Sequence, residues 1–261
     1  MTQRIALGLE YDGGRYAGWQ RQRHAASVQD MVERGVSRVA DEPVSVTAAG
    51  RTDSGVHATQ QVVHFDTEAD RPDRAWVRGV TSNLPDDIGV LWVRRPASDF
   101  HARYEALSRT YRYLLLSDSR RPVLNRDRVA WTWKPLQLAP MREAATYLLG
   151  EHDFSSFRAV ACQARHAVRR LHRLDVSYDS GYAYIDIEAN AFVHHMVRNI
   201  VGSLMLVGAG ERPPGWMGEL LAARDRTAGG VTAPAGGLYM TGVAYPDRHG
   251  IPAQGWLPRF A

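Results

Sequence analysis

Apolar and polar residues alternate in several short stretches of the chain, and a period of two is typical of strands with one buried face. Elsewhere the apolar positions recur at helical spacing. Ser27 with Asp30 resembles a capping box, so a helix is expected to begin there. The first half therefore predicts strand, helix, strand, strand, helix, strand, over residues 4–11, 27–40, 44–48, 61–65, 74–83 and 88–94.

The second half shows the same order of patterns. It predicts a strand at 110–116, a helix at 138–149, hairpin strands at 168–178 and 182–188, a helix at 192–207, a short helix at 216–223 and a strand at 238–245. The order β-α-β-β-α-β is the ferredoxin-like, or RRM-like, unit. We expect an α+β protein of two such units, residues 1–104 and 105–261, with mainly antiparallel sheets, a pseudo-two-fold relation and a cleft between them.

A tight loop lies between the strands predicted at 44–48 and 61–65. It reads Ala-Gly-Arg-Thr-Asp-Ser-Gly-Val-His-Ala over 49–58, with Arg51 two residues before Asp53. Loops between strands hold catalytic groups on a rigid frame. An ionised carboxylate beside a cation suits a nucleophile or a charge stabiliser better than a general acid. The pattern fits equally well an Asx-turn, in which Asp53 caps backbone N–H groups.

Two further groups of residues are candidates for a site. Tyr111 and Tyr113 share one face of a predicted strand, either as core side chains or with one ring stacked on a ligand. Arg198 lies in an apolar helical stretch, where it either pairs with a carboxylate or turns to solvent. His194 and His195 precede it, and adjacent histidines on a helix point apart. With no HExxH or CxxC spacing in the chain, we expect no metal site.

Positive charge in this chain is carried by arginine. The formal net charge is +4, and Lys134 is the one lysine among 32 Lys and Arg residues. Arginine binds phosphate in a planar fork and stacks on bases, although a compositional bias explains the count equally well. Arginine, histidine and aromatic residues mix at 13–24 and 100–104, and a further basic stretch follows at 162–170. Each stretch alone fits a solvated surface, and together they would fit an RNA-binding track.

The remaining features exclude several classes of protein. Cys162 is the single cysteine, so no disulfide can form within the chain. No signal-peptide pattern occupies residues 1–10, and the apolar stretch 191–209 holds three basic residues, so a cytoplasmic protein without membrane spans is expected. No GxGxxG follows a predicted strand. A methyltransferase that uses Cys162 is thus less favoured than an inert thiol.

Motifs along nearly the whole chain resemble the TruA family of tRNA pseudouridine synthases. The loop AGRTDSGVHA (49–58) resembles the family signature, with Ser54 where alanine is usual. A hydroxyl there could hydrogen-bond Asp53. The other matching motifs, in family order, are LEYDGGRYAGWQRQ (9–22), SNLPDDI (82–88), DFHARY (99–104), YRY (111–113), GEHDFSSFRA (150–159), NAFVHHMVRNIVGSLM (190–205) and LAARDRT (221–227).

The resemblance implies an isomerase that converts uridine to pseudouridine at positions 38, 39 and 40 of the tRNA anticodon stem–loop, without a cofactor. It implies Asp53 as the nucleophile, Arg198 as its partner, Arg51 as the residue that replaces the flipped base, and Tyr111 against the uracil. It implies a homodimer and two sheets joined side by side. The implied tRNA contacts are Phe100, His101, Ala102, Arg103 and Tyr104, and Ala161, Cys162, Gln163, Ala164 and Arg165.

One alternative from another class of function stays open at this stage. A non-catalytic RNA-binding protein built from two RRM-like units would show the same order of elements. The first and last predicted strands lack the aromatic pattern that such domains use to stack bases, which counts against it.

Overall fold

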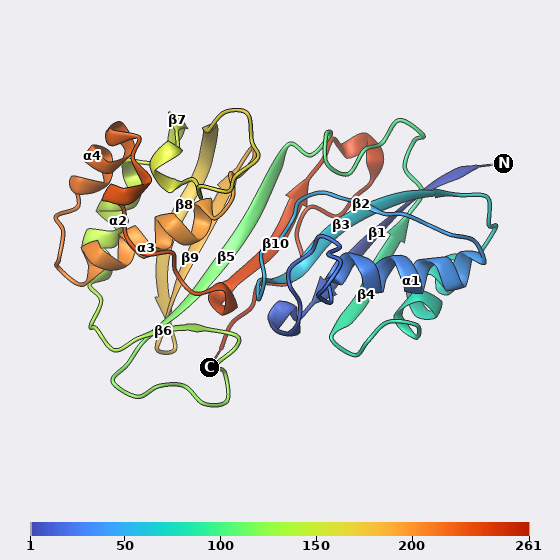
Figure 1. Cartoon of the computed structure of the whole chain (residues 1–261), viewed down its shortest axis with the longest axis horizontal. Coiled ribbons are helices and arrows are strands. Elements are labelled where there is room, and N and C mark those ends of the chain that lie inside the picture. Colours follow the sequence, from blue (N-terminus) through green and yellow to red (C-terminus); the bar gives the residue numbers. More distant parts are fainter. Residues whose placement is uncertain (1, 261) are drawn as a thin grey trace. The chain divides into compact units, whose positions relative to one another are not determined.

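The computed structural model describes residues 2–260 and has an α+β fold with mostly antiparallel strands (Figure 1). The chain divides into two compact units. The first unit comprises Met1–Arg109 and Tyr239–Leu257, and the second comprises Thr110–Leu238 and Pro258–Ala261. The first unit thus includes most of the last strand. The expected division into 1–104 and 105–261 differs in this respect, because residues close to the C-terminus return to the N-terminal sheet.

The sheet of the first unit is centred on two long strands, β1 and β3. Strands β4, β1 and β3 lie in that order and pair antiparallel. Strand β2 pairs antiparallel with β3 at His64, and β10 pairs parallel with β3 at His57. The strands are β1 (Gln3–Tyr11), β2 (Thr47–Ala48), β3 (His57–Thr67), β4 (Ile88–Arg94) and β10 (Leu238–Ala244).

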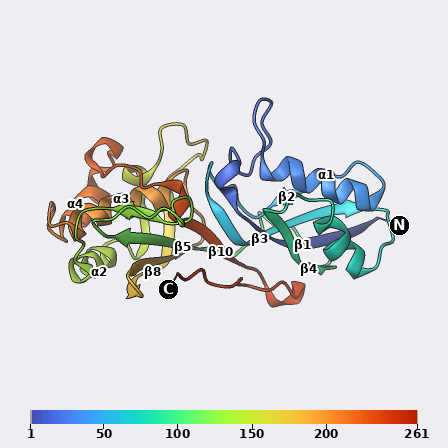
Figure 2. The ribbon, with the colours of Figure 1, turned by 90° about the horizontal axis from the view of Figure 1, so that it is seen from below.

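Helix α1 (Val28–Ala40) lies against one face of this sheet (Figure 2). Its N-cap is Ser27, whose side chain accepts a hydrogen bond from the Asp30 N–H, as the capping pattern predicted. Val28, Val32 and Val36 recur at helical spacing and are fully buried. The shorter helical segments of this unit are η1 (Gly13–Arg15), η6 (Asp247–His249) and η2 (Ala75–Gly79), a π-helical turn within the helix predicted at 74–83.

The strands of the second unit lie in the order β5-β9-β8-β7, with β6 parallel to β5. Helices α2, α3 and α4 form the helical layer, and α2 contacts both α3 and β8. The strands are β5 (Ser108–Ser117), β6 (Ala130–Thr132), β7 (Gly150–Asp153), β8 (Val168–Asp179) and β9 (Tyr182–Ala189). The helical elements are α2 (Leu138–Thr146), α3 (Met196–Gly208), α4 (Trp216–Ala223), η3 (Ser155–Phe157), η4 (Arg226–Ala228) and η5 (Ala235–Gly237).

Most predicted elements are present, although several bounds differ. Strand β2 covers only the end of the strand predicted at 44–48, and β3 extends beyond 61–65 at both ends. Strands β6 and β7 were not predicted, because three or four residues are too short to show a period. Helix α3 begins at Met196 rather than at 192, since Asn190 Oδ1 accepts the Ala191 N–H and His195 takes a left-handed conformation (φ 63°). Within residues 2–260, no helix is both long and apolar enough to cross a membrane.

Candidate active site

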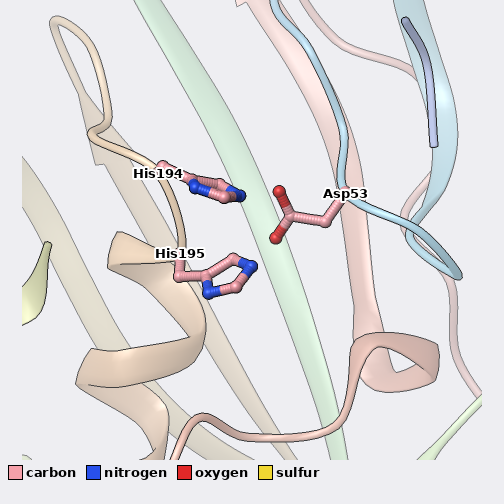
Figure 3. Close-up of side chains that lie close together, drawn as sticks. All are labelled: Asp53, His194 and His195. Atoms are coloured by element: carbon pink, nitrogen blue, oxygen red, sulfur yellow. The ribbon is translucent and has the colours of Figure 1, made fainter. Parts of the chain in front are cut away.

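Asp53 lies in the loop between β2 and β3 of the first unit (Figure 3). The loop turns tightly just after it, where the Val56 N–H donates to the Asp53 carbonyl oxygen at 3.1 Å. Gly55 takes a positive φ of 77°, a conformation that a residue with a Cβ adopts with strain. The local sequence Asp-Ser-Gly-Val therefore fixes the direction in which the carboxylate leaves the backbone.

The residues on either side of Asp53 are held by the segment 11–19. Trp19 N–H donates to the Thr52 carbonyl oxygen at 3.0 Å, and the Tyr11 hydroxyl bonds the Thr52 hydroxyl at 2.9 Å. The Ser54 hydroxyl donates to the Tyr16 carbonyl oxygen at 3.2 Å. The expected hydrogen bond from Ser54 to Asp53 is thus replaced by one that ties the loop to segment 11–19.

Arg51 is exposed, although the backbone around it is fixed. Gln61 Nε2 donates to the Gly50 carbonyl oxygen at 2.8 Å, and Arg109 donates to the Ala49 carbonyl oxygen at 3.0 Å. An arginine that extends into solvent from an ordered backbone can reach a ligand without moving the loop. The geometry is compatible with the predicted role of Arg51 and leaves that role a prediction.

The segment Phe100–Tyr104 of the first unit buries two of its side chains and exposes two others. Phe100 and Ala102 are fully buried, whereas Arg103 and Tyr104 are exposed. The ring of His101 stacks on Tyr104 at 4.2 Å, and Arg103 lies over the Tyr104 ring at 5.8 Å. A cation and stacked rings on a backbone anchored from behind suit contact with RNA.

Arg109 was not predicted to matter, yet it joins this segment to the Asp53 loop. Arg109 is 9% exposed, and its guanidinium group donates to the carbonyl oxygens of Ala49 (3.0 Å), Ala106 (3.0 Å) and Arg103 (2.6 Å). A single buried side chain thus fixes both loops of the first unit. Nothing in the sequence around an arginine beside a predicted strand indicates that its side chain bonds to backbone carbonyls far along the chain.

In the second unit, Tyr111 and Tyr113 of β5 are both buried, which is the first of the two arrangements left open by their shared face. Tyr111 packs edge-on against Phe192 with ring centroids 5.1 Å apart. Tyr113 donates from its hydroxyl to the Pro234 carbonyl oxygen at 2.8 Å. Arg112 points the other way and makes a double hydrogen bond with Asp186, 2.7 Å for each contact. Tyr113 is thus a structural residue, and the role of Tyr111 stays a prediction.

Arg198 lies in the first turns of α3 and is half-buried. Its Nε donates to the Ala233 carbonyl oxygen at 2.7 Å, and the Ala233 N–H donates back to the Arg198 carbonyl oxygen at 3.1 Å. These bonds aim the guanidinium group. Segment 230–234 is tied to α3 in turn, because Arg226 donates to the side-chain oxygens of Asn199 (3.0 Å) and Thr232 (3.2 Å).

His194 and His195 lie just before α3 rather than on it (Figure 3). Their ring centroids are 4.0 Å apart, with planes tilted by 46°. The expectation that the two rings point apart was wrong, because it assumed a helix that includes both residues. The left-handed backbone at His195 turns its ring toward that of His194.

The segment Ala161–Arg165 of the second unit is a loop shaped by Arg158, a residue that the sequence reasoning missed. Arg158 donates to the carbonyl oxygens of Cys162 (2.8 Å) and Ala164 (2.7 Å). Cys162 Sγ accepts the His194 N–H at 3.4 Å. Burial acts to raise the pKa of Cys162, but the N–H groups of Ala164 and His194 and the Arg158 cation lower it below its ordinary value.

Comparison with known proteins identifies the family. The family model described as tRNA pseudouridine synthase matches residues 9–105 and 144–246. A tRNA pseudouridine synthase A of Methylococcus capsulatus is 56% identical over 248 residues, which cover 95% of this chain and 92% of that protein. The protein of the same name from Shigella boydii is 53% identical over 257 residues, 98% of this chain and 95% of that one.

One matching solved structure is that of an H/ACA RNP bound to a substrate RNA containing 2′-deoxyuridine. The TM-score is 0.39 at 11% identity, and the match covers 90% of this chain and 47% of that chain. The sequence matches place the protein among the isomerases that form pseudouridine. More narrowly, the chain belongs to the tRNA pseudouridine synthase family, which confirms the resemblance read from its motifs.

Proposed function

We propose that the protein converts uridine to pseudouridine at positions 38, 39 and 40 of the tRNA anticodon stem–loop, with Asp53 as the nucleophile. The observation that carries the proposal is the Asp53 loop. A carboxylate stands in a tight turn whose neighbours on both sides are hydrogen-bonded to segment 11–19. Nucleophilic and electrostatic catalysis both depend on groups that are positioned before the substrate arrives.

The reaction rearranges one bond and needs no co-reactant. The bond from ribose C1′ to N1 breaks, a bond from C1′ to C5 forms, the C5 hydrogen leaves as a proton, and N1 gains a proton. No electrons enter or leave. Asp53 would attack C1′ or C6, or would remove a ribose proton to give a glycal. Each route needs an ionised carboxylate held at the nucleoside, so the same loop serves all of them.

The finer architecture belongs to the same proposal. We expect two ferredoxin-like units related by a pseudo-two-fold, with sheets joined side by side and a cleft between them. The first unit would carry the Asp53 loop and the second would complete the cleft with Arg198 and Tyr111. The antiparallel order β4-β1-β3-β2 of the first unit supports this.

Tyr111→Phe should keep uridine binding but slow proton loss from C5; an unchanged rate would limit Tyr111 to packing.

Arg51 has a separate role in the proposal, that of filling the space left by the flipped uridine. Flipping costs a few kcal/mol in a paired or stacked stem and much less in a flexible strand. Arg51→Ala should therefore lose more activity on a structured stem–loop than on an unstructured oligonucleotide of the same sequence. Equal losses on the two substrates would assign Arg51 another role.

The partners and location complete the proposal. Phe100–Tyr104 and Ala161–Arg165 would contact the tRNA backbone, and two copies of the chain would act together as a homodimer in the cytoplasm, without metal or cofactor. Arg103, Tyr104 and Arg165 are exposed on loops that Arg109 and Arg158 anchor, which supports the contacts. Sedimentation of the protein with and without tRNA measures the assembly; a monomer in both would remove the dimer from the proposal.

The test of the function is a map of the product. A tRNA transcript with uridines at 38, 39 and 40 is incubated with the protein and a chelator, with no cofactor added. Pseudouridine is then located by carbodiimide modification and primer extension. Stops at these positions, and none in transcripts with cytidine there, are expected. Tight tRNA binding without any product would favour the non-catalytic RNA-binding protein instead.

A further inference from the structure

The main chain of Tyr16 is a fixed point for the Asp53 loop. Its carbonyl oxygen accepts two hydrogen bonds from the residues that follow Asp53, one from the Ser54 hydroxyl (3.2 Å) and one from the Gly55 N–H (3.4 Å). The Tyr16 N–H closes turn η1 by donating to the Gly13 carbonyl oxygen at 3.0 Å. The position of Tyr16 therefore sets where the turn after Asp53 lies.

The side chain of Tyr16 is anchored in turn by Asp87, in the loop before β4. The Tyr16 hydroxyl donates to Asp87 Oδ1, and the Asp12 N–H donates to the Asp87 carbonyl oxygen at 2.9 Å. Burial and the Asp87 carboxylate raise the pKa of Tyr16 well above its ordinary value, so the hydroxyl keeps its proton at neutral pH. Tyr16 is 7% exposed, which leaves its ring a single packed position.

Two glycines let segment 11–19 approach the loop closely. A Cβ on Gly18 would lie 2.6 Å from the Thr52 carbonyl oxygen and 3.0 Å from the Asp53 carbonyl carbon. A Cβ on Gly13 would lie 1.9 Å from the Val56 carbonyl oxygen. Backbone thus contacts backbone directly before and after Asp53, and a shift of segment 11–19 must shift the loop.

We propose that Tyr16 and Asp87 are a positioning pair for the catalytic loop, which act on Asp53 through the Tyr16 carbonyl oxygen. This inference rests on the proposed function, since it assigns the pair to the step that Asp53 performs. The proposal also assigns a structural role to two motifs, 9–22 and 82–88, for which the proposed reaction gives no other role. Ser54 adds a second bond to the same anchor, where alanine would leave only the Gly55 N–H.

The test compares single-turnover rates at saturating tRNA with tRNA dissociation constants. Tyr16→Phe and Asp87→Ala should each lower the rate about tenfold or more, because small displacements of a reacting group are costly. The dissociation constant should change less than about twofold. The double variant should be no slower than the worse single variant, since the two residues act as one unit. Asp87→Asn, which keeps an acceptor for the hydroxyl, should recover most of the rate.

Tyr184→Phe is the matched control. Tyr184 is also a buried tyrosine, 3% exposed, and its hydroxyl bonds the Phe260 carbonyl oxygen at 3.2 Å within the second unit. It should keep the wild-type rate. Full activity in folded Tyr16→Phe, or additive losses in the double variant, would overturn the proposal.

Hydrogen exchange separates this inference from the proposed function. Tyr16→Phe should speed exchange at the Gly55 and Val56 amides relative to wild type, while the amides of β1 and β4 stay protected. If wild type makes no pseudouridine, the proposed function fails. Unchanged exchange at the Gly55 amide in Tyr16→Phe would overturn the positioning pair, whatever the result for the function.

Discussion

Replacing Arg109 with methionine should loosen two loops of the first unit at once. Methionine keeps the aliphatic stem but removes the three hydrogen bonds to the carbonyl oxygens of Ala49, Ala106 and Arg103. A hydrogen bond from a charged donor contributes about 1.5–3 kcal/mol, and such bonds in one network do not add fully. Burying the guanidinium group costs desolvation energy, which offsets part of what these hydrogen bonds contribute. We therefore expect Arg109→Met to lower the free energy of unfolding by about 3–5 kcal/mol.

The assay is urea unfolding followed by tryptophan fluorescence, with the midpoint and the slope fitted together. The stability of Arg109→Lys should lie between that of wild type and that of Arg109→Met, because an ammonium group can reach fewer of the three carbonyl oxygens. Arg74→Met is the matched control, since Arg74 is exposed in the same unit and should change stability by less than about 0.5 kcal/mol. A loss below about 1 kcal/mol in Arg109→Met, with an unchanged slope, would refute the reasoning.

Three further predictions concern other parts of the molecule. Burial, Arg4 and His101 lower the pKa of His64 to about 4, below its unfolded value near 6.5. The neutral form contributes stability fully above pH 6.5, and about 3 kcal/mol should be lost as the pH falls from 6.5 to 4; His64→Gln should flatten that part of the stability profile, and an unchanged profile would contradict the assignment. Gly18→Ala should lower both stability and kcat, because its φ of 90° and the 2.6 Å approach to the Thr52 carbonyl oxygen leave no room for a methyl group; a wild-type kcat would show that the loop can adjust. Arg226→Met should cost about 1–3 kcal/mol in thermal unfolding by leaving Asn199 Oδ1 without this donor, whereas Arg224→Met, on an exposed neighbour, should cost under about 1 kcal/mol.

Regular patterns made the strands and helices predictable. The period of two predicted β1 to within a residue, and the strand predicted at 88–94 matches β4. Ser180-Gly181 marked the turn between β8 and β9, where both residues have positive φ. The start of α3 was not predictable, because the apolar spacing already begins at residue 192. The hydrogen bond from the Ala191 N–H to Asn190 Oδ1 and the left-handed backbone of His195 keep these residues out of the helix. Local sequence carries periodicity but not the competing bond.

The candidate site was predictable only in part, for a related reason. Asp53 stands out because it lies between two glycines in a loop flanked by strands. The residues that hold the loops do not stand out. Arg109, Arg158 and Asp87 look like surface charges in the sequence, and their partners lie at backbone carbonyls or at a tyrosine far along the chain. A charge bonded to backbone leaves no pattern in the sequence, since every residue offers the same carbonyl.

The most direct test of the central claim is tritium release from tRNA labelled at C5 of the anticodon-loop uridines, with wild type beside Asp53→Asn and no cofactor or metal added. In pseudouridine, C5 carries ribose C1′ in place of its hydrogen, so the C5 hydrogen must be lost before the product is complete and its release reports the isomerisation itself. The account predicts release by wild type, none by Asp53→Asn, and equal tRNA binding by both. Release by Asp53→Asn at the wild-type rate would contradict the assignment of Asp53 as the nucleophile.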